Sequence, residues 1–346
     1  MDLLQRTVEA IGPLDTQAME KAKERLDNLL KPRGSLGRLE DIAVQLAGIT
    51  GTAGRQISKK AIIVMCSDNG VTEEGISSFS SEVSTLVTET ILKGISGVSV
   101  LSRHAGAGLL VVDIGLGGDI YDSRIIHRKI RRGTSNIAKG PAMTREEAVR
   151  AIETGIEITC TAIDEGADLL GTGEIGIGNT TTSSAVLRVF TGAGFDEVVG
   201  RGAGLSDDGL RHKKDVIRRA VMLNRPDPGD PIDVLSRVGG FDLAGLAGCY
   251  LAAAARRVPI VVDGFISGAA AVAAVKIHPE TRSFMFSSHT SAEPGTSAIS
   301  RALDLYPMLA LDMRLGEGTG CALAFHIIEA AVKIMNEMGT FKDIGM

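Results

Sequence analysis

Five short runs of almost unbroken apolar residues divide the middle of the chain, and helical stretches separate them. The runs cover residues 61–68, 108–115, 167–174, 258–265 and 282–289. Continuous apolar strands that alternate with helices are typical of a parallel sheet buried on both faces. We therefore expect an α/β fold in which helices cover both faces of a parallel sheet.

The two ends of the chain have a different pattern. Residues 15–31 and 36–50 have helical periodicity and are joined by a connector that contains Pro and Gly. Residues 301–346 return to a helical pattern. We expect residues 1–58 and 301–346 to form a small helical lobe, and residues 59–300 to form a large α/β catalytic domain.

Polar residues close the apolar runs, and their position makes them candidates for a binding site. Ligands of parallel α/β sheets bind beyond the carboxyl ends of the strands. An acid inside an apolar run also requires a partner or a ligand, because burying an unpaired charge is costly. The candidates at these ends are Asp68, Asp113, Glu174, Asp263, Ser288 and His289.

Composition narrows the class of protein. Hydrophobic residues make up 44% of the chain and charged residues 23%, which is typical of a soluble globular protein. The net charge of -5 and the 3% of aromatic residues argue against nucleic acid as a partner. No apolar stretch reaches the roughly 20 residues of a membrane span. Four widely spaced cysteines predict reduced thiols and a cytoplasmic location.

The segment GTGEIGIGNTTTSS, residues 171–184, combines glycines with hydroxyl side chains at a predicted helix start. Backbone N–H groups and hydroxyls in such a place favour a phosphate-binding loop, and an ordinary threonine cap is the alternative. The segment also satisfies G-x-G-x-x-G through Gly171, Gly173 and Gly176, a motif of nicotinamide-dinucleotide oxidoreductases. That match is weak in a chain with 42 glycines.

A second glycine-rich segment, GRGAGLSDDGLRHKK, covers residues 200–214. Two glycine loops with Lys213 behind one of them suit a sugar phosphate that is held from two sides. A surface loop before a solvated basic helix is the alternative interpretation. The acids of this segment lack the apolar lead-in of pyrophosphate-sugar motifs, and we expect no metal and no cofactor.

The stretch RLGEGTG, residues 314–320, places Glu317 among three glycines. Glycine permits close approach of the backbone to a ligand and allows left-handed φ values. Glu317 could therefore lie against a bound molecule. The alternative is an acid at a helix N-terminus, because an apolar helical run follows.

Eight ordered motifs together resemble the nicotinate-nucleotide–dimethylbenzimidazole phosphoribosyltransferase family. They lie at residues 31–40, 67–75, 131–143, 173–185, 200–205, 262–271, 287–295 and 314–320. The resemblance implies a Rossmann-like parallel sheet, a small helical lobe, and a homodimer, with pairing to a paralogous subunit as the alternative. It also implies two substrates: nicotinate mononucleotide and an aromatic base such as 5,6-dimethylbenzimidazole.

The resemblance assigns roles to individual residues. Glu317 matches the catalytic base, which accepts a proton from the attacking aromatic base. The residues expected to bind phosphate and ribose are Gly176, Gly178, Asn179, Thr180, Gly202, Gly204 and Lys213. The residues expected in the substrate pocket are Glu174, Asp263, Ser291, Ser80, Thr88 and Leu315.

The chain departs from the family pattern at two positions. Asn69 stands where the family usually has histidine, and Thr88 where a glutamine of the base pocket is common. Because some relatives activate phenolic bases, a phenol such as p-cresol is the alternative acceptor. The transfer of ribose 5-phosphate is expected in either case.

Overall fold

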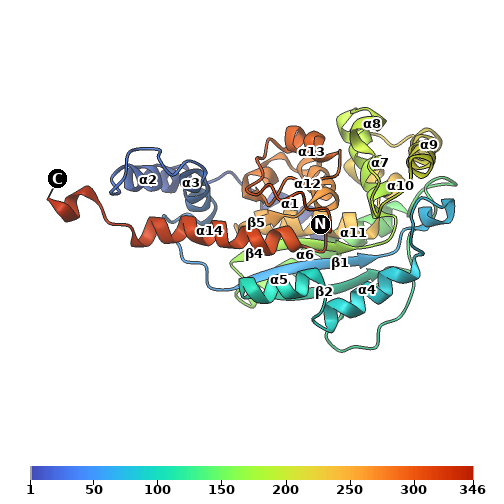
Figure 1. Ribbon diagram of the computed structural model, residues 1–346, viewed down its shortest axis with the longest axis horizontal. Helices are drawn as coiled ribbons and strands as arrows, with labels where there is room; N and C mark the ends of the chain where they lie inside the picture. Colours follow the sequence, from blue (N-terminus) through green and yellow to red (C-terminus); the bar gives the residue numbers. More distant parts are fainter. Residues whose placement is uncertain (1, 346) are drawn as a thin grey trace.

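A six-stranded sheet forms the centre of the protein, whose computed structural model describes residues 2–345 (Figure 1). The strands lie in the order β3-β2-β1-β4-β5-β6, and every neighbouring pair is parallel. Their bounds are β1 (Lys60–Ser67), β2 (Ala107–Gly115), β3 (Ile126–His127), β4 (Leu169–Ile175), β5 (Ile260–Val262) and β6 (Met285–Ser287). This order is that of a doubly wound Rossmann-type sheet, which reverses direction between β1 and β4. The predicted fold class is confirmed.

The five apolar runs correspond to β1, β2, β4, β5 and β6. The sequence did not predict β3, because this edge strand has only two residues and pairs through Ile126 and His127 alone. Two residues are too few to produce a recognisable alternation.

Helices surround the sheet. The first half of the chain contains α1 (Leu3–Glu9), α2 (Thr16–Asp27), α3 (Arg38–Thr50), the 3-10 helix η1 (Gly70–Glu74), α4 (Glu82–Leu92), α5 (Gly97–Ala105) and α6 (Arg145–Asp164). The second half contains α7 (Asn179–Thr191), α8 (Phe195–Val198), α9 (Asp207–Asn224), α10 (Pro231–Val238), α11 (Phe241–Ala255), α12 (Phe265–Ile277), η2 (Pro279–Phe284), α13 (Thr296–Leu303), α14 (Thr319–Glu337) and η3 (Phe341–Ile344).

Two successive residues of β4 show that helices cover both faces of the sheet. Thr172 points to α11, where its hydroxyl lies 2.8 Å from the hydroxyl of Tyr250. Gly171 points to α14, because an added Cβ would meet Cys321 and Phe325. Successive side chains of a strand point to opposite faces, so α11 and α14 lie on opposite sides of the sheet.

A small helical lobe lies at one end of the molecule, where Figure 1 shows α2 and α3 beside the C-terminal part of α14. Arg25 of α2 donates to the backbone oxygen of Met335 (2.6 Å), and Leu29 pairs with Thr340 in an antiparallel bridge. The first helix, α1, instead packs against α6 and α11. The division of the chain at residues 58 and 300 stays a prediction.

All four cysteines are unpaired, and three of them, Cys66, Cys249 and Cys321, are buried. No helix within residues 2–345 is both long and apolar enough to cross a lipid bilayer. The cytoplasmic location stays a prediction.

Candidate active site

A cavity of about 550 Å³ lies beyond the carboxyl ends of the strands, and the loops after β4, β5 and β6 form much of its wall. Segments 76–87 and 314–317 close the cavity from other directions, and residues 201–203 and Lys213 complete the wall. The position agrees with the general rule for ligand sites in parallel α/β sheets.

Eleven of the fourteen predicted site residues line this cavity. They are Glu174, Gly176, Gly178, Asn179, Thr180, Gly202, Lys213, Asp263, Ser291, Leu315 and Glu317. The structure therefore brings together residues from both glycine loops and from the Glu317 segment. Their chemical roles stay predictions.

Three predicted residues do not line the cavity. Thr88 is fully buried within α4, and its hydroxyl donates to the backbone oxygen of Ser84 (2.8 Å). Ser80 is exposed beside the rim, and Gly204 lies two residues beyond the lining residue Gly202. Thr88 and Asn69, the two positions that depart from the family pattern, are both buried and outside the lining.

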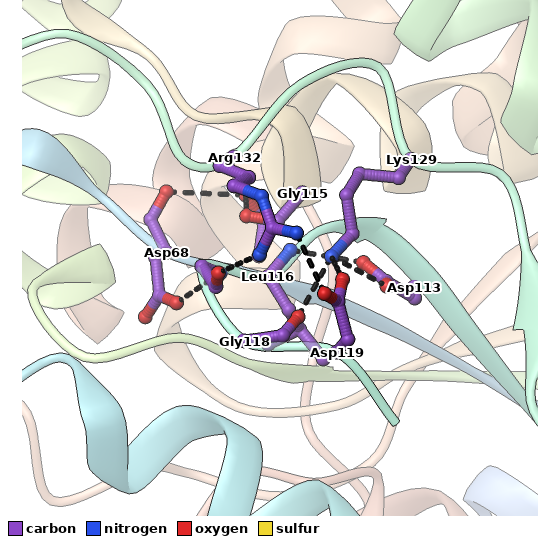
Figure 2. A network of polar contacts seen from close by, with 10 residues as sticks. Asp68, Asp113, Gly115, Leu116, Gly118, Asp119, Lys129 and Arg132 are labelled. Atoms are coloured by element: carbon purple, nitrogen blue, oxygen red, sulfur yellow. Dashed lines mark hydrogen bonds and ion pairs between the residues drawn. The ribbon is translucent and has the colours of Figure 1, made fainter. Parts of the chain in front are cut away.

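Of the other strand-end candidates, His289 lines the cavity, whereas Asp68, Asp113 and Ser288 do not. Figure 2 shows Asp68 and Asp113 in a polar network around the loop that follows β2. The N–H of Gly117 donates to Asp68 (2.7 Å), and the N–H of Leu116 donates to Asp113 (2.9 Å). These two acids hold the loop in place.

Glu317 occupies an unusual turn directly before α14. Its φ is +64°, and the flanking Gly316 and Gly318 have φ values of +84° and +97°. Three successive left-handed residues are rare, and only glycine adopts this region without a steric cost. A side chain at Gly316 would also collide with the carboxylate of Glu174. The two flanking glycines are therefore required by the turn that presents Glu317.

Only one of the two carboxylate oxygens of Glu317 accepts a hydrogen bond within residues 2–345. Its Oε2 accepts the N–H of Val98 (2.9 Å) at the start of α5, and the residue is 7% exposed. Among residues 2–345, no donor lies within hydrogen-bond distance of Oε1. An anchored carboxylate with one uncommitted oxygen at a cavity wall is suited to accept a proton. Both interpretations of the sequence are compatible with this geometry, because Glu317 precedes a helix and also lines the cavity.

Asp263, which follows the end of β5, binds the first turn of α14. Its Oδ2 accepts the N–H of Gly318 (3.0 Å), and its Oδ1 accepts the N–H of Gly320 (2.8 Å). Burial raises the pKa of this carboxyl to about 7, although these backbone bonds favour the charged form.

A set of three buried polar side chains, Glu174, Asn179 and Asp242, joins the loop after β4 to α11. The side-chain amide of Asn179 donates to Glu174 and to Asp242 (3.2 Å). Burial, and then the neighbouring charge of Asp242, raises the pKa of Glu174 well above its ordinary range. Burial also raises the pKa of Asp242 to about 6. The protonated form of Glu174 is therefore favoured more than in an exposed glutamate.

The start of α7 forms another part of the cavity wall. Asn179 and Thr180 begin this helix, and no side chain caps its N-terminus. The ammonium of Lys213 donates to the hydroxyl of Thr180 (2.8 Å), and this lysine is 1% exposed. Burial lowers its pKa to about 8. A buried cation at a helix N-terminus is a favourable place for a phosphate group.

Some lining residues were not predicted from the sequence. The apolar residues Ile76, Phe79, Val83 and Val87 line the cavity together with the predicted, exposed Leu315. The i, i+4 spacing of Val83 and Val87 was a usable signal, because it places both on one face of α4. Asp242 does not line the cavity but accepts from the lining residue Asn179, and no sequence signal distinguished it from other acids near helix starts.

The glycine motif of the oxidoreductase alternative does not have the required structural context. Gly171 and Gly173 lie inside β4, whereas a dinucleotide-binding motif requires glycines in the turn after the strand. Gly173 instead makes room for the backbone of Glu317, which an added Cβ would contact. Within residues 2–345, no group of three or more His, Cys, Asp or Glu side chains is arranged to hold a metal.

Comparison with known proteins agrees with this geometry. A family model described as "Phosphoribosyltransferase" matches residues 11–346. A relative from Ruminiclostridium cellulolyticum, named nicotinate-nucleotide–dimethylbenzimidazole phosphoribosyltransferase, is 57% identical over 98% of this chain and 96% of its own length. The chain belongs to this phosphoribosyltransferase family.

More distant members of the family have the same extent and the same fold. A phosphoribosyltransferase of the same name from Geobacter metallireducens is 48% identical over 100% of this chain and 98% of its own. The crystal structure of CobT from Thermus thermophilus superimposes with a TM-score of 0.92 at 39% identity. The match covers 95% of this chain and 99% of that one.

Proposed function

We propose that this phosphoribosyltransferase moves ribose 5-phosphate from nicotinate mononucleotide to 5,6-dimethylbenzimidazole or a related aromatic base. The products are an α-riboside phosphate, a precursor of the cobalamin nucleotide loop, and nicotinate. The observation that carries the proposal is a single cavity with a proton acceptor, Glu317, on one wall and a phosphate-binding arrangement, Thr180 with Lys213, on another.

The phosphate of the nucleotide is placed at the start of α7. There the N-terminus of the helix, which no side chain caps, and the ammonium of Lys213 can both bind it. The buried ammonium then gains an anionic partner, which offsets the cost of its desolvation. This placement leaves C1′ of the ribose between the two walls of the cavity.

The aromatic base is placed against the apolar wall formed by Val83, Val87 and Leu315, near Glu317. One ring nitrogen attacks C1′, and the bond from C1′ to the pyridinium nitrogen breaks with its electron pair remaining on nicotinate. The leaving ring loses its positive charge and requires no proton. The second ring nitrogen of the attacking base transfers its proton to Glu317, and attack from the opposite face yields the α-linked product.

Much of the rate enhancement that proton transfer to Glu317 does not supply comes from alignment of the two rings around C1′. Effective concentrations of well-oriented groups reach about 10⁵–10⁸ M. Glycines at positions 173, 176 and 316 allow the backbone segments around the site to approach closely. The cavity therefore contributes mainly by positioning.

A competition assay tests the proposal. The purified protein is given nicotinate mononucleotide together with dimethylbenzimidazole, adenine and p-cresol, and the riboside phosphates are separated and identified by mass spectrometry. We expect the α-linked benzimidazole product. Absence of every riboside phosphate would refute the transfer, and a phenolic product alone would identify p-cresol as the acceptor class.

We also propose a homodimer. Leu86, Ile95 and Val100 of the α4–α5 region are each at least half exposed, which favours contact with another chain. Light scattering of the purified protein distinguishes a homodimer from a monomer that requires a paralogous subunit.

A further inference from the structure

The start of α14 depends on a side chain that is distant in sequence. No side chain of the preceding turn caps this helix, whose N-cap residue is Gly318. The first-turn N–H groups of Gly318 and Gly320 donate instead to the two oxygens of Asp263, 55 and 57 residues away. Helix N-termini leave such N–H groups without partners, and a carboxylate there is stabilising.

The environment of Asp263 leaves little freedom for this contact. The residue is 3% exposed, and Nδ1 of His289 lies 3.9 Å from its Oδ1. A side chain at position 320 would collide with both His289 and Asp263. Asp263 and α14 therefore fit together in one arrangement, with glycine required between them.

The contact lies next to the catalytic turn. Gly318 follows Glu317 directly, so the bond to Asp263 fixes the backbone on the C-terminal side of that residue. The bond from Val98 fixes the carboxylate itself. A left-handed conformation at a non-glycine residue costs about 1–2 kcal/mol and persists only where surrounding contacts impose it.

We propose that Asp263 is a positioning residue that acts through the first turn of α14 to hold Glu317 toward the acceptor base. This assignment rests on the proposed transferase function and changes the predicted role of Asp263, which was expected to contact substrate. A residue that acts through Glu317 loses its influence when Glu317 can no longer accept a proton. A residue that contacts substrate keeps its influence.

A double-mutant cycle of Asp263→Asn and Glu317→Gln tests the assignment. In the single variant Asp263→Asn, the amide nitrogen cannot accept the second N–H group. We expect kcat to fall at least about tenfold, with KM for nicotinate mononucleotide within about threefold of the parent value. In the Glu317→Gln background, single-turnover rates should be unchanged by Asp263→Asn.

Asp168→Asn is the matched control. Asp168 also accepts backbone N–H groups with its carboxylate, from Ser58 and Lys59, but at the amino end of β4 and outside the cavity. We expect its kcat to equal that of the parent. Asp263→Glu, which keeps the charge and moves it by one methylene, replaces Asp263→Asn in the same cycle if the asparagine variant does not fold.

Two results would overturn the assignment. An equal loss from Asp263→Asn in both backgrounds would mean that Asp263 acts on substrate independently of Glu317. Unchanged kcat in the single variant would mean that the contact does not position Glu317. A different outcome concerns the proposed function itself, which fails if the parent protein transfers no ribose phosphate.

Hydrogen exchange at the backbone N–H groups of Gly318 and Gly320 then tests the contact separately. If Asp263 holds this turn, these groups should exchange faster in Asp263→Asn than in the parent.

Discussion

A single residue, Glu317, combines the chemical and the conformational demands of the site. Its carboxylate is anchored by Val98 at the cavity wall, and its backbone adopts a conformation that glycine would adopt more readily. The local sequence predicted this partly, because glycines on both sides indicated unusual φ values. That the glutamate itself shares the left-handed conformation had no signal in the sequence.

Replacing Glu317 with glutamine should separate catalysis from binding. The amide keeps the shape of the side chain but cannot accept the proton, so we expect turnover to fall about 10²- to 10⁴-fold. The affinity for nicotinate mononucleotide, measured by calorimetry, should change little. Turnover equal to that of the parent would refute the assignment of Glu317 as the base.

Replacing Glu317 with alanine or with glycine should reveal the conformational cost. Both variants lose the carboxylate and leave the Val98 N–H without its partner, but only glycine relieves the left-handed strain. We expect the glycine variant to be more stable than the alanine variant by about 1 kcal/mol, after the entropy cost of glycine is included. Urea unfolding measures the difference, and a more stable alanine variant would contradict the strain.

At the scale of elements, two helices meet to form the phosphate-binding part of the cavity. The N-terminus of α7 supplies Thr180 and the positive end of the helix dipole, and α9 supplies Lys213 from its buried side. The sequence predicted that α7 begins after a glycine turn. It did not decide whether Lys213 was buried or belonged to a solvated basic helix.

Lys213→Met should weaken binding of the nucleotide, whereas Lys214→Met should not. Lys214 is the adjacent control, because it pairs with Asp196 and does not line the cavity. Hydrogen bonds to charged groups contribute about 1.5–3 kcal/mol, so we expect KM for nicotinate mononucleotide to rise roughly 10- to 100-fold in Lys213→Met. Similar KM values in both variants would place the phosphate elsewhere.

The same lysine predicts a pH dependence of binding. Its pKa is lowered to about 8 by burial, so its positive charge is present below that pH and is lost as pH rises through it. We expect KM of the parent protein to increase above pH 8 and the KM of Lys213→Met to lack this increase. Steady-state kinetics on both sides of that pH compare the two.

The sequence predicted elements better than it predicted contacts between them. Continuous apolar runs located five of six strands, because burial on both faces removes polar residues from a strand. Predictions of individual cavity residues were less accurate. The hydroxyl of Thr88 donates within α4 instead of facing the cavity, and Gly204 is not a lining residue. Val83 lines the cavity from α4, and Asp242 of α11 contacts the lining residue Asn179. The spacing of residues along the chain does not predict such contacts between separate elements.

At the scale of the whole molecule, the carboxyl edge of the sheet concentrates buried acids. Glu174, Asp242 and Asp263 are all within this region, and the pKa of each is raised, mainly by burial. Burial in this region therefore disfavours the charged form of all three groups. Such raised values are common where burial serves a functional site.

This concentration of acids predicts that their contribution to stability falls as pH rises from about 4 to about 7. The pKa values of Asp242 and Asp263 are about 6 and 7, against 3.8 as the ordinary value. Between these values the folded protein retains protons that the unfolded chain releases, so raising the pH favours unfolding. Calorimetry of the parent and of Asp242→Asn isolates the contribution of Asp242, and the Tm of the variant relative to that of the parent should rise across this range. A difference in Tm between the parent and Asp242→Asn that does not change with pH would contradict the raised pKa of Asp242.

The buried thiols of Cys249 and Cys321 can be used to measure how often parts of the protein unfold. Cys321 lies in the first turn of α14, just beyond the turn that presents Glu317, and burial raises its pKa, so it does not react while that turn is closed. Cys249 lies deep in α11 and becomes accessible only when the sheet and its helices separate. A thiol reagent applied in pulses would therefore label Cys321 at the rate of local opening and Cys249 at the rate of global unfolding. Two labelling rates from one unmodified chain would separate the motion of the catalytic turn from the lifetime of the whole fold.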